Sequence, residues 1–428
     1  MSATVGCRTA ALLTAVCAMC AVSGAGLAQP TTNTACSVPV MYGGEQMTAE
    51  KYESGSSWSV VMDQDWFQLD KIARHTDRNY TMGFGLSRAG SVVRNQGHDV
   101  LLRLTEAALE RLVPVPERTV GTARRKLWSS LRYEDCGQSQ AFVEMLHGTA
   151  FTPDSIEDPS PIGDDRPYAF LLGWTVRRVT STNGGKAAWT SELTVGHVGS
   201  TLGRDVQRGI HRAIHKNPPE GWENQIHNTG VSILGVPVAR YGLSYERQLG
   251  AVTWQRIGHA ILGHDCDGEC AAKPGRRAME VTVEGGGEIG YYTTASIGTR
   301  LRLGSFASPF WTARQNPLGG VGARGVSKHT LPIDFFAFAG GRSRLVGYNL
   351  LLSGYGTSAG PVRVEQRRVR RLVHEWEAGV AAEWEYRRHR SVQLSWVVDA
   401  GRSPEFKGPL ARSHHWGGFY LTARRNWQ

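Results

Sequence analysis

The chain has 428 residues, with 48 lysines and arginines against 38 aspartates and glutamates, and a formal net charge of +10. Its 51 glycines are about 12% of the chain, well above the roughly 7% of an average protein. Charged residues make up only 20%, which argues against disorder driven by charge. No run of about 20 apolar residues follows the N-terminus, so a bundle of membrane-spanning helices is excluded. A membrane β-barrel is not excluded, because its strands alternate and form no long apolar run.

The N-terminal segment has the pattern of a secretory signal. Met1–Ala28 holds one basic residue, Arg8, no acidic residue, and an apolar stretch from Ala10 to Val22. It closes on Gly26-Leu27-Ala28, with small residues at both recognition positions of a signal peptidase. The apolar stretch is short for a membrane anchor. We therefore expect cleavage after Ala28, which removes Arg8 and lowers the net charge from +10 to +9.

Four cysteines remain after this cleavage, an even number in an exported chain, where disulfides form. They are Cys36, Cys136, Cys266 and Cys270. A disulfide between the last two would close a small loop. A zinc site is the alternative, although it would need more ligands than the nearby His264. We favour the loop disulfide.

The surplus of basic residues raises the question of partners. Nucleic acid is one candidate, but the export signal argues against it. An anionic membrane surface or an anionic lipid is the better expectation. An ordinary solvated basic surface accounts for most of these charges.

The mature chain reads as an all-β protein. Residues 29–56 are polar and rich in turn formers, and we interpret them as a loose N-terminal extension. From Ser57 onward, short segments place Gly, Ser or Thr on one parity and large apolar residues on the other, which is typical of strands. The predicted strands are Ser59–Trp66, Thr81–Ser87, Ala169–Arg178, Trp189–Val195, Val238–Arg247, Thr253–Ile261, Met279–Gly285, Ala295–Leu303, Phe335–Arg342, Tyr348–Ser353, Glu377–Tyr386, Val392–Val398 and Gly418–Ala423.

Composition does not say which kind of β fold this is. The 13 tryptophans and 13 tyrosines fit the aromatic girdles of an outer-membrane barrel. They also fit a soluble sandwich or barrel. The mean hydropathy of −0.30 is compatible with either, because a membrane barrel has a polar lumen.

Two segments have helical spacing. Asp99–Val113 is stopped by the prolines that follow it, and we expect it to lie over the barrel mouth or on the membrane surface. Its apolar face is formed by Leu101, Leu104, Ala108 and Leu112.

The second helical segment, Arg204–Lys216, carries two histidines. Gln207 and His211 share one face, and His215 lies one further turn along. A histidine can act as a general base near neutral pH. By spacing alone, an ordinary surface histidine is the more frequent case, and spacing does not choose between His211 and His215.

Five blocks of sequence, in order, resemble one family. Asp63-Gln64-Asp65-Trp66-Phe67 and Thr76–Gly83 are similar to its opening motifs E-N-D-x-F and T-D-R-x-Y-T-N-G. Phe151–Ile156 and Asp164–Ala169 are similar to Y-T-P-x-x-I and D-D-R-P-Y-A. The family is that of the LpxR-type lipid A 3'-O-deacylases.

The remaining blocks follow in the second half of the chain. Gly196–Gly203, Val206-Gln207, His211 and Gly221–Gln225 resemble G-x-x-G-P-x-x-x-G, V-Q, H and G-W-x-x-Q. Pro404–Gly408 resembles the E-F-x-x-Q segment that precedes the last strand. Each block alone is weakly specific, whereas the ordered set is strongly so. The resemblance runs from about Trp58 to the C-terminus.

The resemblance implies a closed antiparallel transmembrane β-barrel of about 12 strands, with short helices in its loops. It also implies hydrolysis, with calcium, of the ester that holds the 3'-linked acyloxyacyl group of lipid A. His211 takes the place of the histidine that activates water. Gln64 and Asp65 take the place of an Asn-Asp pair, Asp65 being the expected Ca²⁺ ligand, and Thr81 that of a motif threonine.

The residue types suit this chemistry. Ester hydrolysis needs a base to deprotonate water and a positive group to hold the oxyanion. A calcium ion held by Asp65 and carbonyl oxygens would supply the second. Thr81 would orient the water or the acyl carbonyl. Asp165 and Arg166 are candidates for gripping a phosphate or sugar, since arginine makes bidentate phosphate contacts.

The chain also departs from the family pattern. Gln64 stands where the family has Asn, one methylene shorter. Asn217 stands where a carboxylate is expected six residues after the histidine, and Glu220 is the nearest acid beyond it; we place both at the substrate side of the site. There are two apparent insertions, 98–126 and 266–274, and Trp427 replaces the usual terminal Phe.

The sequence thus predicts a signal (1–28), an extension (29–56) and a deacylase-like barrel (57–428) in the outer membrane of a Gram-negative bacterium. We expect a monomer that binds lipid A, lipopolysaccharide and outer-membrane lipids, and no nucleic acid. Two alternatives stay open. One is a catalytically impaired structural or lipid-binding barrel, favoured by Gln64 and Asn217. The other is an outer-membrane phospholipase with a similar mechanism.

Overall fold

The computed structural model describes most of the chain from residue 56 onward. The described ranges are 40–42, 45–47, 56–67, 79–90, 93, 99–112, 139–182, 186–213, 215, 217–227, 235–262, 276–312, 315–316, 320–321, 333–355, 360–387 and 390–425. The predicted signal, the four cysteines of the mature chain and Trp427 lie outside these residues, so the predictions on them remain predictions.

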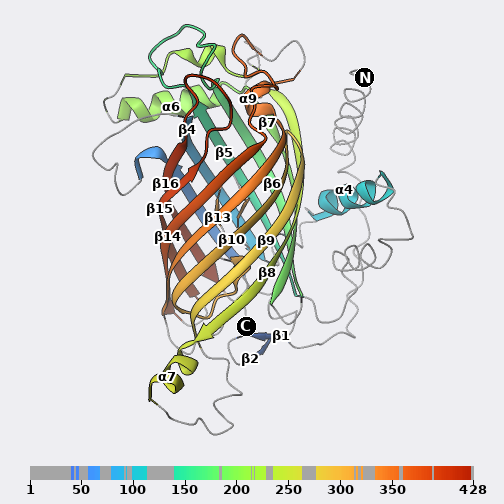
Figure 1. Ribbon diagram of the computed structural model, residues 1–428, viewed down its shortest axis with the longest axis vertical. Helices are drawn as coiled ribbons and strands as arrows, with labels where there is room; N and C mark the ends of the chain where they lie inside the picture. Colours follow the sequence, from blue (N-terminus) through green and yellow to red (C-terminus); the bar gives the residue numbers. More distant parts are fainter. Residues whose placement is uncertain are drawn as a thin grey trace.

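Twelve antiparallel strands of the described residues close into one barrel, and β16 pairs with β3 to seal it (Figure 1). Each strand pairs with its neighbours along the chain, as in an up-and-down barrel. The strands are β3 (Ser56–Gln64), β4 (Asn79–Gly90), β5 (Ser139–Thr152), β6 (Ala169–Thr182), β7 (Ala187–Val198), β8 (Val236–Thr253), β9 (Arg277–Gly290), β10 (Tyr292–Phe306), β13 (Ile333–Asn349), β14 (Leu372–Arg387), β15 (Arg390–Arg402) and β16 (His414–Arg425).

Short elements occupy the connections. The connections at one end of the barrel hold η1 (Asp65–Phe67), α6 (Leu202–Ala213), η3 (Gly221–Asn224) and α9 (Leu350–Ser353), and we call this the α6 end. The opposite end, where β3 begins and β16 ends, carries α7 (Trp254–Leu262) (Figure 1). The other described elements are β1 (Val40–Tyr42), β2 (Glu45–Met47), α4 (Asp99–Leu112), η4 (Phe310–Thr312), β11 (Gln315–Asn316) and β12 (Gly320–Val321).

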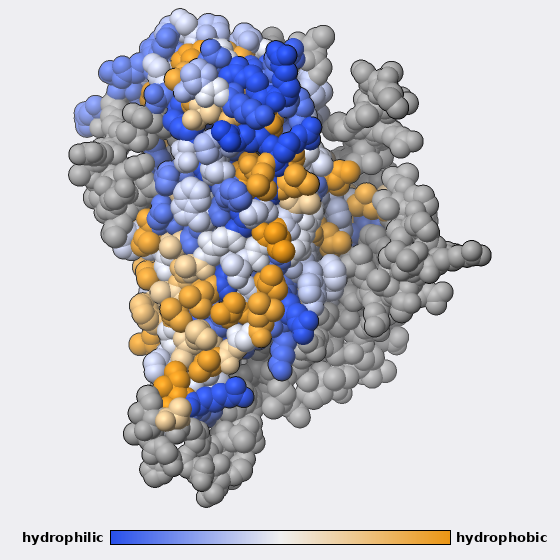
Figure 2. Space-filling view, in the orientation of Figure 1, coloured by the Kyte–Doolittle hydropathy of each residue, from blue (hydrophilic) through white to orange (hydrophobic). Residues whose placement is uncertain are grey.

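The outward face of the barrel wall is apolar, and its inward face carries many charged and polar residues beside buried apolar clusters. Along β3, Trp58, Val60 and Met62 are exposed, while the residues between them are buried. The same alternation places Phe419 and Leu421 of β16 outside. Figure 2 shows apolar residues gathered on the wall and hydrophilic residues gathered at the α6 end. This is the pattern of a transmembrane barrel and not of a soluble one. Among the described residues, no helix is both long and apolar enough to cross a membrane.

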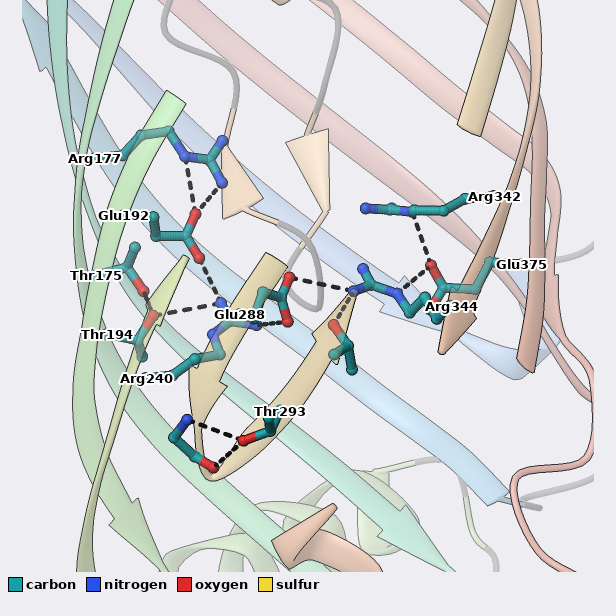
Figure 3. Close-up of polar contacts among 12 residues, drawn as sticks. Thr175, Arg177, Glu192, Thr194, Arg240, Glu288, Thr293, Arg342, Arg344 and Glu375 are labelled. Atoms are coloured by element: carbon teal, nitrogen blue, oxygen red, sulfur yellow. Dashed lines mark hydrogen bonds and ion pairs between the residues drawn. The ribbon is translucent and has the colours of Figure 1, made fainter. Parts of the chain in front are cut away.

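A chain of ion pairs runs through the lumen (Figure 3). Arg177 of β6 pairs with Glu192 of β7, which also pairs with Arg240 of β8. Arg240 reaches Glu288 of β9 at 3.4 Å, and Glu288 reaches Arg344 of β13 at 3.2 Å. The charges belong to different strands, so each pair fastens one part of the wall to another.

The chain of charges continues toward the α6 end. Glu375 of β14 lies 3.0 Å from Arg344 and 2.6 Å from Arg402 of β15. Arg402 pairs with Glu405 at 3.0 Å, and Glu405 pairs with Arg166, which precedes β6, at 2.5 Å. The network that began on β6 therefore returns to the segment that leads into β6.

Two predicted strand segments are wrong, because both are largely helical. β8 ends at Thr253, and α7 takes up the rest of Thr253–Ile261. Trp254, Ile257 and Ile261 are spaced three and four residues apart, which a helix satisfies as well as a strand does. Tyr348–Ser353 ends β13 and begins α9, where the Asn349 side chain accepts a hydrogen bond from Leu351 N, as an N-cap does.

One barrel strand, β5, was not predicted. Its inward face is partly apolar, because Val143 and Met145 pack in a buried cluster with Phe310 and Trp311 of η4. Its outward face carries Glu144, which pairs with Arg88 on β4. Both faces therefore mix polar and apolar residues, and the alternation that marks a strand is lost.

Helix α4 confirms the predicted helix but rests elsewhere than expected. It lies against the outer wall of β6 and β7, where Leu102 packs with Val176 and Leu193. Glu106, one turn later, holds Arg178 of β6 at 2.7 Å through both carboxylate oxygens. This ion pair turns the Leu102 face toward the wall, so Leu104 of the predicted apolar face is exposed.

We expect Glu192→Gln to destabilise the barrel strongly, because Arg177 and Arg240 would then face each other without a shared carboxylate. Removing one partner of a buried ion pair costs about 3–5 kcal/mol. A closed barrel that is not heated often stays folded on a denaturing gel and migrates faster than the unfolded chain. The measurement is the temperature at which this fast-migrating folded band is lost. Glu365→Gln, an exposed loop carboxylate, is the control, and equal midpoints for the two variants would contradict the prediction.

A candidate active site between α6 and the outer wall

Helix α6 begins after a sharp turn and lies flat on the wall. Gly199 has a φ of +88°, and a Cβ there would meet the carbonyl of His227 at 2.3 Å, so only glycine fits this turn. The Ser200 hydroxyl accepts a hydrogen bond from Leu202 N at 3.2 Å, which satisfies a donor at the start of the helix. Gly203 lets α6 approach the Phe170 ring, which a Cβ would overlap.

The face of α6 that meets the wall has two parts. Val206 and Ile210 pack against a buried cluster on the barrel's outer side. Gly203, Gln207 and His211, spaced four residues apart, form a buried stripe beside them. The cluster under the helix contains Met82, Ala150, Tyr168, Phe170 and Trp222.

His211 is held in one orientation by the main chain. It is 3% exposed, and its Nδ1 lies 2.5 Å from the carbonyl oxygen of Asn217. A carbonyl oxygen only accepts, so Nδ1 carries the proton and Nε2 has the lone pair of the neutral ring. An imidazole fixed at Nδ1 with a basic Nε2 is the arrangement of a general base.

His215 does not share this face, which corrects the predicted extent of the helix. α6 ends at Ala213, and His215 lies beyond it, exposed, with a left-handed φ of 57°. Its amide donates to the Arg212 carbonyl at 3.3 Å, as a residue that terminates a helix does. The prolines at 218 and 219 follow immediately, so the helix has no room to continue.

Gln207 lies one turn before His211 and is fixed by Trp222. The indole Nε1 donates to the Gln207 side-chain oxygen at 2.7 Å, and both side chains are buried. The amide nitrogen of Gln207 is also buried and has no hydrogen-bond partner among the described residues. This leaves a donor in the interface between α6 and the wall.

Gln64 and Asp65 lie where β3 reaches the α6 end. Gln64 continues the outward parity of Met62, yet it is only 4% exposed. Its cross-strand neighbour is Met82, which belongs to the cluster under α6. The Gln64 side-chain oxygen is buried without a hydrogen-bond partner among the described residues, and Asp65, 4% exposed, starts η1 beside it.

Thr81 is placed by a β-bulge. The register of β4 with β5 shifts between Tyr80 and Met82, which leaves Thr81 as the extra residue. A bulge re-aims the side chain it carries. The Thr81 hydroxyl lies 2.7 Å from that of Thr152, and both are buried. Thr152, in the Phe151–Ile156 block, was not predicted as a site residue.

Asp165 and Arg166 are engaged by internal partners. Asp165 accepts from the amides of Asp154 and Arg166 at 2.7 Å, and Arg412 contacts both of its oxygens at 2.9 and 3.1 Å. Arg166 lies over the Phe151 ring at 3.9 Å and pairs with Glu405. Both are 1% exposed. Their contact with substrate stays a prediction, while their geometry shows that they hold loops together.

Asn217 and Glu220 lie in the segment between α6 and η3, and both side chains are exposed. The side-chain amide of Asn217 donates a hydrogen bond to the Glu157 carboxylate at 3.1 Å and none to His211. The Glu220 amide donates to the Ile156 carbonyl at 2.8 Å. The segment is therefore tied to the β5–β6 connection through both residues, and Asn217 serves His211 through its carbonyl and not its side chain.

The predicted Ca²⁺ site stays a prediction. Within the described ranges, no group of three or more His, Cys, Asp or Glu residues is arranged to hold a metal ion. Calcium binds oxygen ligands, and these include amide and main-chain carbonyls as well as carboxylates. The buried Gln64 oxygen and the adjacent Asp65 carboxylate fit such an ion as two ligands.

Residues from sequence blocks that are separate in the chain contact one another at this site. Tyr168 donates to the Ile156 carbonyl at 3.1 Å, and Trp222 reaches Gln207. A closed antiparallel barrel with charged residues in its lumen and an apolar outward face is the architecture of an outer-membrane β-barrel protein. The candidate site lies on the outer side of this wall.

Comparison with known proteins identifies the particular family. The chain belongs to the family described as "Outer membrane protein LpxR", whose model matches residues 33–425. Its place is the outer membrane of a Gram-negative bacterium. No curated protein sequence matches the chain.

A solved structure, LpxR from Salmonella typhimurium, superposes with a TM-score of 0.56 and 14% sequence identity, covering 86% of this chain and 99% of that one. This likeness shows the same fold. The β-domain of the Bordetella autotransporter Brka gives a TM-score of 0.33 at 9% identity, covering 87% and 100% of the two chains, which is too low to argue from.

Glu405 generates a prediction about acid. Burial alone would raise the pKa of its carboxyl, but the charges of Arg166 and Arg402 outweigh burial and lower that pKa to about 2. Its pairing therefore stabilises the fold above the ordinary glutamate pKa of about 4.3 and is lost as the pH falls toward 2.

We expect Glu405→Gln to unfold at a lower temperature than the parent at pH 7, and this difference to shrink between pH 4.5 and 2. The folded-band midpoint, measured across pH, checks it. A difference that stays constant down to about pH 2 would show that Glu405 is not the titrating group.

Proposed function

We propose that the protein is an outer-membrane esterase that hydrolyses the 3'-linked acyloxyacyl ester of lipid A. The observation that carries this proposal is the position of His211, a buried residue of α6 next to Ile210, which packs on the outward face of the wall. We place the α6 end at the outer leaflet, where the ester at the head of an acyl chain lies between the polar and hydrocarbon regions. A base outside the barrel meets a lipid directly, whereas a base in the lumen would not.

His211 supplies the general base. Its Nε2 accepts a proton from water while the water oxygen attacks the ester carbonyl. The Asn217 carbonyl holds Nδ1–H and stabilises the imidazolium that forms. The same Nε2 proton then passes to the alkoxide that leaves when the tetrahedral intermediate collapses. The products are a free acyloxyacyl acid and a lipid A hydroxyl.

The oxyanion of the intermediate needs donors. The buried Gln207 amide nitrogen, one helical turn from His211, is a suitable donor. The Thr81–Thr152 hydroxyl pair provides a further polar group at the same end of the wall. When bound, a calcium ion would add positive charge near the developing oxyanion. Gln64 and Asp65 are the residues that we propose to hold it.

The two departures from the family pattern are compatible with activity. Gln64 keeps the amide oxygen that Asn would offer, and this oxygen is buried without a partner in the described part of the chain. Asn217 replaces an acid, but His211 is oriented by the main-chain carbonyl of that position. These contacts favour an enzyme over a structural barrel.

We expect His211→Ala to lower deacylation by ~10²–10⁴-fold, the usual contribution of a general base. The measurement is mass spectrometry of lipid A from cells with and without the protein, where activity removes an acyloxyacyl mass. The parent rate should rise with pH over the range in which histidine loses its proton, and this rise should be absent in His211→Ala.

Two variants test the assignment. His215→Ala should keep most activity, because His215 is exposed beyond the helix. Asn217→Ala should lose less than about tenfold, because the carbonyl that holds His211 remains, and this is well below the loss of a general base. Near-parental activity in His211→Ala would place the base elsewhere. Unchanged lipid A with release of phospholipid fatty acids would support a phospholipase instead.

Calcium makes a separate prediction. Activity should be lost in a chelator and return on adding Ca²⁺, and Asp65→Asn should weaken the return because it removes the anionic ligand. The dependence of rate on free Ca²⁺ in parent and variant is the measurement. Full activity in chelator would remove the metal from the mechanism and leave Asp65 as a polar neighbour of the site.

A further inference from the structure

A second polar feature of the α6 end lies away from the candidate active site. Exposed basic residues line a surface pocket of about 410 Å³ where the chain enters β14. Its lining consists of Gln366, Arg367, Val369, Arg370, Arg371, Leu372 and Lys407. Between β14 and β4, where α6 rests, the barrel order places β15, β16 and β3.

The backbone around this pocket is fixed. Val369 pairs with Phe406 in an isolated antiparallel bridge, and both side chains are buried. The Arg370 amide donates to the Glu405 carbonyl at 2.8 Å, and the Lys407 amide donates to the Arg368 carbonyl at 2.7 Å. The bridge sets Lys407 beside the arginine segment, so the cations are brought together before any ligand arrives.

The charge in the pocket is largely uncompensated. Within the described part of the chain, no carboxylate lies within ion-pair distance of Arg370, Arg371 or Lys407. Arg367 contacts Glu365 at 2.5 Å, but both side chains are mostly exposed, and such pairs contribute little. Several cations in one pocket without a carboxylate attract an anion.

The pocket borders the apolar wall. Leu372 lines it and is 54% exposed, and its cross-strand partner Leu345 is 59% exposed on the same outward face. A bound molecule therefore meets cations at the α6 end and apolar side chains directly below. A phosphorylated lipid has both parts in that order, and arginines recognise phosphate through paired donors.

We propose that this pocket binds a phosphate group of a lipid A molecule in the outer leaflet, whose acyl chains lie along Leu345 and Leu372. The bound lipid A is a neighbour of the barrel and not the molecule at His211. The proposal rests on the outer-membrane location and on our placement of the α6 end at the outer leaflet, and not on the esterase activity. Its role is to anchor the barrel to the surrounding lipopolysaccharide at a fixed height.

The test measures lipid A binding to the purified barrel in detergent by native mass spectrometry, with His211→Ala as background so that no lipid is hydrolysed. The probes are bisphosphorylated lipid A and the same lipid A with both phosphates removed. The test variant is Arg370→Gln, Arg371→Gln and Lys407→Gln together. The control, Lys186→Gln, Arg387→Gln and Arg390→Gln, removes equal charge at the opposite end of the barrel.

We expect the test variant to bind bisphosphorylated lipid A at least about tenfold more weakly, as loss of several charged contacts implies, and the control to match the background protein. Removing the phosphates should lower binding to the background protein by a similar factor. Equal binding by test and control variants, or equal binding of the two lipids, would overturn the proposal. A folded band on the unheated gel confirms that each variant is intact.

The outcome is separable from that of the esterase proposal. In an otherwise parental chain, the test variant should keep deacylation within a few-fold if the pocket is a separate lipid site. Loss of deacylation by more than about 10²-fold, the scale of a catalytic group, would instead make the pocket part of the substrate site and overturn the separate-site assignment. A failure of deacylation in the parent leaves the binding result unaffected.

Discussion

The structure depends on the ion-pair chain inside the barrel. In a barrel that spans lipid, many apolar side chains of the wall face outward and add nothing to the packing inside. Cohesion between opposite parts of the wall has to come from the lumen, where Glu192, Glu288 and Glu375 each bind arginines from two other strands. Each such group is costly to bury alone and stable only when paired, so the charges specify one arrangement of the wall.

The same chain of charges reaches the candidate site. Glu405 links Arg402 of the barrel to Arg166, which stands beside Asp165 and its contacts to the amide of Asp154. The segment that follows Asp154 carries Ile156, whose carbonyl receives Tyr168 and the amide of Glu220. Arg166 and Asp165 thus position the loops that contact the segment after α6. The ion pairs in the lumen are connected to these loops through Glu405.

Much of this could be predicted from sequence, and the exceptions have physical causes. Alternation predicted eleven of the barrel strands, but β5 has an inward face that packs on Phe310 and Trp311, residues far away in the chain. The Asn349 cap favours a helix at Leu350–Ser353, although the apolar run there was predicted as a strand. In the site, His211 was predicted from the resemblance, yet its orientation by the Asn217 carbonyl was not, because a main-chain contact leaves no trace in residue identity.

Several charged groups on the outward face of the wall are paired with a neighbouring element. Arg88 forms an ion pair with Glu144 on the next strand, and Arg178 forms one with Glu106 of α4. Gln64, next to the cluster under α6, and Gln207 of α6 are also buried. Each keeps one buried polar atom without a partner in the described part of the chain. An unpaired buried amide costs stability. In the proposed reaction, the Gln207 nitrogen would donate to the ester oxyanion and the Gln64 oxygen would be a ligand of Ca²⁺, so the proposed chemistry would use both of these buried polar atoms.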